Sequence, residues 1–203
     1  LITNLKLEGL GYRKISKELN RRGIKSHNGK DFYPSLVSNI WRKINLMYSI
    51  VDLEATGGKF NEESIIEIAI YKYDGSKVID QFISLVNPHK DITPYVEKLT
   101  GISAKMVNTA PTFSQVAKRI IEITDNSILV AHNAQFDYRL LQIEFDRLGY
   151  EYIKESICTV ILSQNLLPNR ESYKLGKLVK SLGIPLTQRH RASGDARAPV
   201  ELF

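Results

Sequence analysis

The sequence predicts a mixed α/β fold, in which a sheet is flanked by helices, preceded by a small all-helical domain. The first 45 residues contain only segments with helical periodicity. From residue 46 onward, short apolar runs of strand type are followed by alternating helical and strand-like segments. The net charge also changes sign between the two parts. We therefore assign residues 1–45 to a helix-turn-helix domain and residues 46–203 to an α/β domain.

Composition excludes several classes of protein. The chain has 203 residues and is 43% hydrophobic, which is enough to bury a core. Its single cysteine, Cys158, rules out an internal disulfide and a cysteine-rich zinc site, so a reducing, cytoplasmic location is expected. No apolar run approaches the roughly 18–20 residues of a membrane helix, so no membrane partner is expected. Because the chain begins at Leu1 without a signal-peptide pattern, we expect it to be part of a longer protein.

Three short helices are expected in the first domain. The first covers residues 2–7 and is followed by a glycine-containing break. The second covers residues 13–22, with Gly23 as its stop and an apolar stripe of Ile15, Leu19 and Ile24. The third has Pro34 in its first turn and an apolar face of Leu36, Val37, Ile40 and Trp41. Helix, turn and helix in this order match the plan of a DNA-binding helix-turn-helix.

All of the net positive charge lies in this first domain. Residues 1–45 hold ten Lys and Arg against three acids, a net charge of +7. The remaining residues hold 18 bases and 19 acids, a net charge of −1. Such asymmetry is typical of a module that faces nucleic acid, and a solvated basic helical surface is the alternative.

The second domain is expected to combine five strands with several helices. The strands are expected at residues 48–52, 64–73, 78–86, 127–132 and 155–160. Asp74-Gly75 is a hairpin-turn signal between the second and third of these strands. Helices are expected at residues 112–124, 137–148 and 174–182, with further helical pieces between residues 94 and 125 broken by Gly101 and Pro111.

Two acids two residues apart fall on the first of these strands. Asp52 and Glu54 would point to the same face of the strand, where neighbouring carboxylates repel each other. A divalent cation between them removes this conflict, and oxygen ligands suit Mg²⁺ or Mn²⁺. The alternative is that both acids face solvent on an edge strand.

Two further clusters contain candidate site residues. Asp137 ends the run Ala-His-Asn-Ala-Gln-Phe-Asp and lies near the start of a helix, where it could also serve as a helix-dipole partner. Asp195 follows His190 by five residues. The alternatives there are a surface histidine and an acid at a helix N-terminus that Ser193 caps.

In this order and spacing, the three clusters resemble the three exonuclease motifs of the DEDDh superfamily. The resemblance covers about residues 47–203 and is greatest to the proofreading exonucleases of bacterial replicative polymerases. It implies a ribonuclease-H-like fold and two divalent cations, Mg²⁺ or Mn²⁺, held by Asp52, Glu54, Asp137 and Asp195. It also implies that His190 is the general base. Because Asp52 projects from the end of its strand into the site, we expect it to bridge the cations, and we expect Glu54, on the same face, to bind metal and orient the attacking water. The expected reaction is metal-dependent 3′–5′ hydrolysis of DNA at a single-stranded 3′ end.

The resemblance also suggests which residues contact the substrate. Thr56 and Gly57 would line the pocket of the terminal nucleotide, and Leu53 and Phe136 would wedge or stack on bases. Core packing is the alternative for Phe136. His132 and Asn133 belong to the same motif, where organising the turn is the alternative to contacting substrate.

The amino-terminal segment is similar to the helix-turn-helix that opens the recombinase domain of large serine recombinases. The similarity is carried by residues 9–24, 28–30 and 35–40. No recombinase catalytic domain is present, so the similarity implies DNA docking and not recombination. The residues expected to dock are Arg13, Lys14, Lys17, Arg21, Arg22, Ser35, Ser38, Asn39 and Arg42.

Near its end, the chain departs from the DEDDh pattern. Pro199 follows Asp195 by four residues, where a proline would kink a helix and change the orientation of Asp195. The chain ends at Phe203 inside this segment, so the natural protein is expected to continue. Some similar bacterial proteins carry a further GIY-YIG-type nuclease domain, and a polymerase is another possible partner. An RNA-trimming exonuclease and a DNA-binding module with a silent nuclease fold remain as alternative functions.

Overall fold

The computed structural model describes residues 1–186 and 190–203. Within these residues the chain forms two compact units, Leu1–Leu46 and Met47–Phe203. No helix in the described part of the chain has the length and apolar character needed to cross a membrane.

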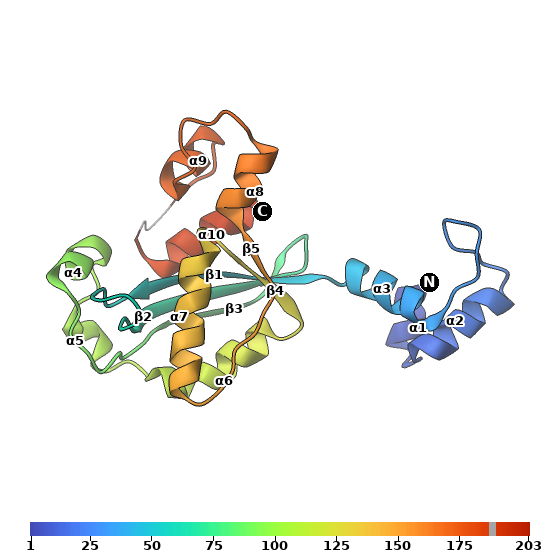
Figure 1. Cartoon of the computed structure of the whole chain (residues 1–203), viewed down its shortest axis with the longest axis horizontal. Coiled ribbons are helices and arrows are strands. Elements are labelled where there is room, and N and C mark those ends of the chain that lie inside the picture. The colour runs from blue at the N-terminus through green and yellow to red at the C-terminus, as the bar shows by residue number, and fades with distance from the viewer. Residues whose placement is uncertain (187–189) are drawn as a thin grey trace. The chain divides into compact units, whose positions relative to one another are not determined.

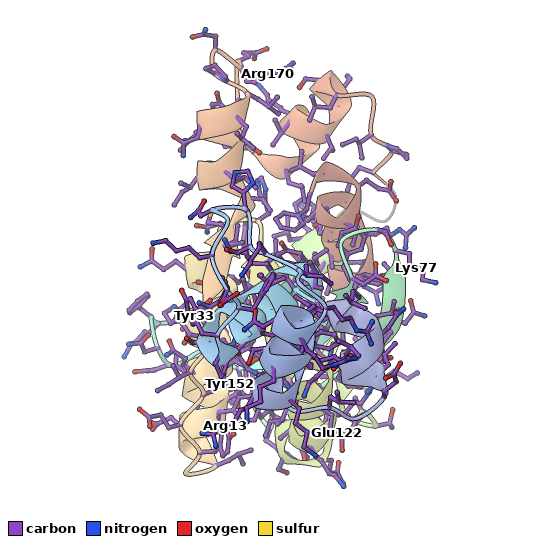
Figure 2. The ribbon with its side chains drawn as sticks, turned by 90° about the vertical axis from the view of Figure 1, so that its right-hand side faces the viewer. Arg13, Tyr33, Lys77, Glu122, Tyr152 and Arg170 are labelled. Atoms are coloured by element: carbon purple, nitrogen blue, oxygen red, sulfur yellow. The ribbon has the colours of Figure 1, made fainter. Side chains whose placement is uncertain are left out.

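The first unit contains three helices around a small core. They are α1 (Ile2–Leu7), α2 (Tyr12–Arg21) and α3 (Pro34–Ile44), close to the predicted bounds. Leu5, Ile15, Leu19 and Val37 are buried together between them. Asn20 exchanges two 2.8 Å hydrogen bonds with the backbone of Phe32, which fixes the loop between α2 and α3. Arg13 and Tyr33 carry exposed side chains on this unit (Figure 2).

The second unit is built on a five-stranded mixed sheet (Figure 1). Its strands are β1 (Met47–Ala55), β2 (Ile65–Tyr73), β3 (Val78–Leu85), β4 (Ser127–Ala131) and β5 (Ser156–Cys158). Their order is β3-β2-β1-β4-β5, and β2 runs antiparallel to both β1 and β3. β4 runs parallel to β1, and β5 runs parallel to β4. The strand β1 therefore lies at the centre, which suits its apolar sequence.

Helices cover both faces of this sheet. They are α4 (Pro94–Thr100), α5 (Ala104–Val107), α6 (Phe113–Thr124), α7 (Ala134–Arg147), α8 (Thr159–Leu166), α9 (Leu175–Ser181) and α10 (Ala192–Leu202). The main core joins α6 and α7 to one face, with Val51 and Leu53 on the strand side. A second core joins Ala192, Ala196 and Val200 of α10 to Ile50 and its neighbours on the other face. The prediction of a mixed sheet flanked by helices is thus confirmed.

Four details differ from the sequence-based expectations. The helix α7 begins at Ala134, three residues before the expected start, after Asn133 in the left-handed conformation (φ 73°). The strand β5 is shorter than expected, and α8 follows it directly. This helix escaped prediction because its apolar residues are consecutive and form no helical stripe.

The fourth difference concerns α10. It begins at Ala192, so Ser193 lies inside its first turn and does not cap it. It also continues through Pro199 to Leu202. The small buried residues Ala192 and Ala196 let this helix pack closely on the sheet. Packing of this kind offsets the hydrogen bond that a proline removes.

Candidate active site

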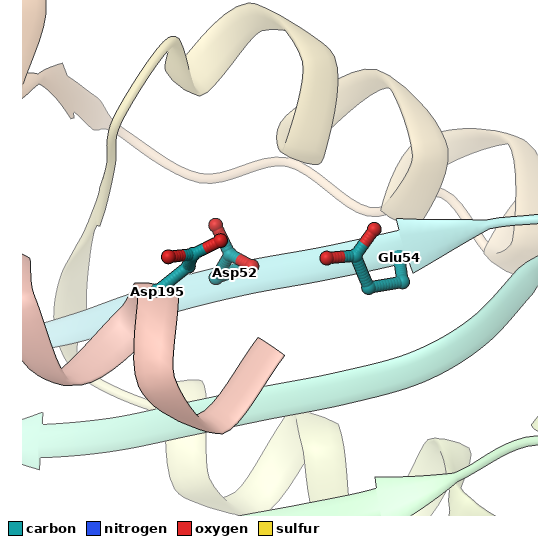
Figure 3. Close-up of side chains that lie close together, drawn as sticks. All are labelled: Asp52, Glu54 and Asp195. Carbon is teal, nitrogen blue, oxygen red and sulfur yellow. The ribbon is translucent and has the colours of Figure 1, made fainter. Parts of the chain in front are cut away.

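Three acids meet where β1 faces the start of α10. Asp52 and Glu54 project from the same side of β1, and Asp195 projects from the first turn of α10 (Figure 3). Each offers one oxygen atom, and these three atoms lie within 4.8 Å of one another. All three side chains are half-buried. The alternation of a strand explains the arrangement, because Leu53 between the two acids points to the opposite face.

Asp137 lies beside this group, on the first turn of α7. Its side chain is 3% exposed, and its Oδ1 accepts a 3.0 Å hydrogen bond from the backbone N–H of Leu53. Its charge raises the pKa of Asp52, and the charge of Glu54 raises the pKa of Asp137. The fold thus gathers carboxylates from β1, α7 and α10 into one region. Asp52, Glu54 and Asp195 form the acid cluster, with Asp137 next to it.

The electrostatics of these carboxylates favour a bound cation. Burial, and then the charges of Asp137, Asp195 and other acids, raise the pKa of Asp52 well above its usual value. Burial, followed by the charges of Asp195 and Glu67, raises the pKa of Glu54 to about 7. Burial also raises the pKa of Asp137. A divalent cation removes this repulsion, and three converging carboxylate oxygens are a donor set that Mg²⁺ and Mn²⁺ accept.

Sequence reasoning missed a buried ion pair next to the acid cluster. Glu67 on β2 is paired in register with Glu54 and is 2% exposed. Its two carboxylate oxygens each accept a 3.1 Å hydrogen bond from Nε of Arg191, and Oε2 accepts a 2.7 Å bond from the N–H of Ala192. The hydroxyl of Tyr71 donates to the carbonyl of Ser193 at 3.3 Å. These contacts fix the start of α10. A single acid inside the run Ile65-Ile66-Glu67-Ile68 was the available signal, because a buried carboxylate needs a partner.

His190 directly precedes this anchor. Its backbone has φ 60°, and its N–H donates a 2.9 Å hydrogen bond to Oδ2 of Asp195. The side chain is half-buried. Residues 187–189, which lead into it, lie outside the described part of the chain. His190 is therefore tied to an acid of the cluster through its backbone, and its role as general base stays a prediction.

The turn after β1 contains two of the predicted substrate contacts. The Thr56 hydroxyl donates to the carbonyl of Gly57 at 3.1 Å and accepts a 3.1 Å hydrogen bond from the N–H of Ser64. Gly57 has φ +71°, and a Cβ atom there would lie 2.9 Å from Oγ1 of Thr93. The Thr56 hydroxyl is thus committed to the turn. Only glycine fits the next position without strain.

The two predicted base-stacking residues have different environments. Leu53 is 4% exposed and lies in the main core, which corrects the expectation that its side chain stacks on terminal bases. The reason is the alternation of β1, which places Leu53 opposite the acids. Phe136 is 37% exposed and precedes the buried Asp137. Its ring is therefore accessible beside the acid cluster.

His132 and Asn133 organise the segment between β4 and α7. The His132 Nδ1 atom lies 2.9 Å from the Thr159 hydroxyl, and its Nε2 atom lies 2.9 Å from the carbonyl oxygen of Tyr173. Burial lowers the pKa of His132, so the ring is neutral and Nε2 donates to the carbonyl. Both residues also line a hollow of about 530 Å³ with Tyr173, Lys174 and Leu175. The two residues therefore border a hollow, and both nitrogens of the imidazole are already within hydrogen-bonding distance of protein atoms.

The predicted DNA-docking residues all belong to the first unit. Five of them lie on α2 or just after it, and all five are exposed: Arg13, Lys14, Lys17, Arg21 and Arg22. Ser35, Asn39 and Arg42 are exposed on α3, and Ser38 is half-buried there. Glu18 forms 2.7 Å ion pairs with both Arg21 and Arg22. Part of the basic charge on α2 is thus already neutralised.

A mixed sheet in this order, flanked by helices and carrying converging carboxylates at its centre, defines a nuclease of the ribonuclease-H-like fold. Residues 49–203 match the protein family described as Exonuclease, and the chain belongs to that family. Residues 1–47 match a second family, described as Recombinase.

Curated relatives are similar over most of this chain. The PolC-type DNA polymerase III of Caldanaerobacter subterraneus is 32% identical over 181 residues, covering 89% of this chain and 13% of that protein. The 3′-5′ exonuclease DinG of Staphylococcus aureus (strain USA300) is 34% identical over 157 residues, covering 77% of this chain and 18% of that protein. The chain thus spans less than a fifth of the length of these relatives.

Solved structures share the fold. Exonuclease X in complex with 5′ overhanging duplex DNA has a TM-score of 0.64 and 28% identity, covering 76% of this chain and 87% of that one. The nuclease domain of 3′hExo, a DEDDh family member bound to rAMP, has a TM-score of 0.67 and 22% identity, covering 77% of this chain and 88% of that one.

Proposed function

We propose that the second unit is a metal-dependent 3′–5′ exonuclease that removes nucleotides from single-stranded 3′ ends of DNA. The observation that carries the proposal is the convergence of carboxylate oxygens from Asp52, Glu54 and Asp195 within 4.8 Å. Membership of the exonuclease family over residues 49–203 supports it. A cluster of acids in a half-buried position is costly unless cations bind there.

We assign the cation sites to Asp52, Glu54, Asp195 and the adjacent Asp137. Two ions, Mg²⁺ or Mn²⁺, would balance the four negative charges of these residues. When bound, such ions polarise water and neutralise the charge that develops on the phosphate and on the departing 3′ oxygen. The charges of Asp137, Asp195 and Glu54 all act on Asp52, which suits a ligand shared by both ions.

The remaining steps fall to the chain's own residues. Glu54 orients the attacking water, because it shares the face of β1 with Asp52. His190 accepts the proton of that water, since an imidazole can take up a proton near neutral pH. Its backbone bond to Asp195 keeps the two residues together. The backbone of Thr56 and Gly57 borders the terminal nucleotide.

DNA is favoured as the substrate over RNA. One relative is named a 3′-5′ exonuclease and another a DNA polymerase III, and exonuclease X was solved with duplex DNA. We extend to this chain the DNA substrate and not the polymerase assembly of those longer proteins. The RNA-trimming alternative is separated by comparing matched DNA and RNA strands, because the 2′-hydroxyl is the feature such a site can sense.

The first unit would dock the enzyme on duplex DNA. Exposed cations on α2 and α3, together with a match to the recombinase family over residues 1–47, support this assignment. Lys and Arg contacts to phosphates make binding sensitive to salt. Deleting residues 1–45 should therefore weaken duplex binding and flatten its salt dependence, while a short single strand is still degraded.

One experiment tests the central proposal. A single strand labelled at its 3′ end is incubated with the protein and Mn²⁺, and the release of labelled nucleotide is followed. We expect labelled nucleotide to be released, and EDTA to abolish the release. A label at the 5′ end should be released only late, after most of the strand has been degraded. Absence of release at every divalent-metal concentration would favour a DNA-binding module with a silent nuclease fold.

A further inference from the structure

Two exposed aromatic rings flank one arginine beside the acid cluster. Phe60, in the loop after β1, is 73% exposed, and Phe136, on the first turn of α7, is 37% exposed. The guanidinium carbon of Arg139 lies 4.3 Å from the ring centroid of Phe60 and 5.6 Å from that of Phe136. We call Phe60, Arg139 and Phe136 the aromatic platform.

The arginine of the platform is held rigidly, and its charge is neutralised. Its two terminal nitrogens each lie 3.0 Å from one carboxylate oxygen of Glu63, and Nη1 also donates to Asn61 at 3.1 Å. The hydrogen bonds from Arg139 lower the pKa of Glu63, whose side chain is 10% exposed, so Glu63 stays charged. With both terminal nitrogens bonded to Glu63 and one of them also to Asn61, Arg139 is better suited to hold the rings than to bind a phosphate.

The platform adjoins the residues that would hold the cations. Phe136 directly precedes Asp137. The Asp137 carboxylate accepts a hydrogen bond from the backbone N–H of Leu53, which lies between the two acids of β1. Phe60 belongs to the loop that leaves the same strand after Glu54. Phe60 contributes little to the core at this exposure, so its ring is available to a ligand.

We propose that the aromatic platform stacks on an unpaired base of the strand whose 3′ end enters the acid cluster. This inference rests on the proposed exonuclease function and adds a subsite upstream of the terminal nucleotide. Flat aromatic rings beside a guanidinium plane suit the face of any base. A base in a duplex already stacks on its neighbours, so the platform would favour a single strand.

The first test measures binding without hydrolysis. In the 203-residue chain carrying Asp52→Asn, the affinity for a labelled single strand is measured by fluorescence anisotropy with Mg²⁺ present. Phe60→Ala should weaken binding by roughly tenfold, the effect of losing one stacked base. Phe60→Tyr should restore affinity, and Phe60→Leu should not. Ile153→Ala removes an apolar side chain of similar exposure, 70%, from a distant loop and should change nothing.

The second test locates the base. Abasic sites are placed one at a time at successive positions from the 3′ end. At one position the abasic strand should bind the parent and the Phe60→Ala protein equally. Equal affinity of the two proteins for every intact strand would overturn the proposal, as would a parent protein that is indifferent to all abasic positions.

The proposal and the exonuclease function fail separately. Release of nucleotides by the wild-type chain in Mn²⁺ reports the function alone. Release together with an unchanged Phe60→Ala affinity would refute the platform and keep the exonuclease. Base-dependent binding lost in Phe60→Ala, without any release, would refute the exonuclease function and retain the platform.

Discussion

Arg191 donates its guanidinium hydrogen bonds to the buried carboxylate of Glu67 and so joins the start of α10 to β2. Glu67 is the register partner of Glu54, and α10 carries Asp195. The ion pair therefore ties α10 to the strand next to β1, whose two acids must converge with Asp195. The negative charge of Glu67 raises the pKa of Glu54, and the positive charge of Arg191 lowers that pKa. Glu67 is thus a positioning residue of the site and not a ligand.

Glu67→Gln should impair the site without unfolding the chain. Glutamine keeps the shape but loses the charge that holds Arg191, so Asp195 is less firmly placed. We expect kcat to fall about tenfold and the Mn²⁺ concentration for half-maximal activity to rise, with KM for DNA little changed. Glu67→Ala should cost about 3 kcal/mol of unfolding free energy as well, because it breaks a buried pair.

Asp80→Asn is the matched control for Glu67→Gln. Asp80 pairs with Arg119 at 2.6 Å, but both side chains are more than one third exposed. Removing this pair should cost less than about 1 kcal/mol and leave the metal dependence unchanged. A Glu67→Gln protein with the metal dependence of the wild type would show that the pair has no positioning role.

The acids of the site could be predicted from the sequence, but the ion pair that positions them could not. Asp52 and Glu54 could be placed on one face because strand alternation depends only on local geometry. Glu67 was missed because its importance depends on Arg191, which reaches it only after the chain has folded. The misassignment of Leu53 had a different origin. Motif resemblance marked it as a substrate contact, whereas its position between two acids on one strand commits it to the core.

The predicted limits of helices and strands were wrong where tertiary contacts outweigh the local sequence pattern. The sheet and most helices follow from apolar periodicity and turn residues such as Asp74, whose carboxylate accepts two backbone N–H groups in the hairpin. The helix α8 has no apolar stripe to mark it. The start of α7 depends on Asn133 in the left-handed conformation, which no simple rule anticipates from composition.

Asp52→Asn should stabilise the metal-free chain and abolish its activity. Burial and the neighbouring carboxylates raise the pKa of Asp52, so replacing it with a neutral amide relieves repulsion. We expect the free energy of unfolding in EDTA at pH 8 to increase by on the order of 1 kcal/mol. The increase in Tm that Mg²⁺ gives the wild type should shrink in the variant. Calorimetry with and without Mg²⁺ checks both, and an unchanged Mg²⁺ effect would exclude Asp52 as a ligand.

Gly57→Ala should disturb the turn that borders the acid cluster. The glycine has φ +71°, and an added Cβ would lie 2.9 Å from Thr93 and 3.0 Å from Val96. Gly101→Ala is the matched control, because its φ of +72° is nearly the same and nothing lies within 4 Å of the added atom. The backbone strain should cost each variant about 1–2 kcal/mol. Only Gly57→Ala should lose more stability than this and raise KM for DNA, and equal losses in both variants would contradict the clash.

Glu18→Gln should strengthen duplex binding by the first unit. The change releases Arg21 and Arg22 from their ion pairs and makes both available to phosphates. Two additional phosphate contacts would steepen the slope of log K against log salt by about 1.8. Glu8→Gln is the control, because it removes the same charge from an exposed residue of the same unit. Equal slopes for the two variants would show that net charge alone matters.

The difference between wild type and Glu18→Gln should also be independent of pH between 5 and 8. Hydrogen bonds from Arg21 and Arg22 lower the pKa of Glu18 to about 2 in the folded unit, from an ordinary value of 4.5. A lowered pKa means that the ion pairs contribute fully above pH 4.5 and are lost as the pH falls through 2. Glu18 therefore holds both arginines throughout the range in which duplex binding can be measured. Affinities of the two proteins measured at pH 5, 6.5 and 8 should keep a constant ratio, and a ratio that falls toward 1 at pH 5 would mean that Glu18 becomes protonated and releases the arginines by itself.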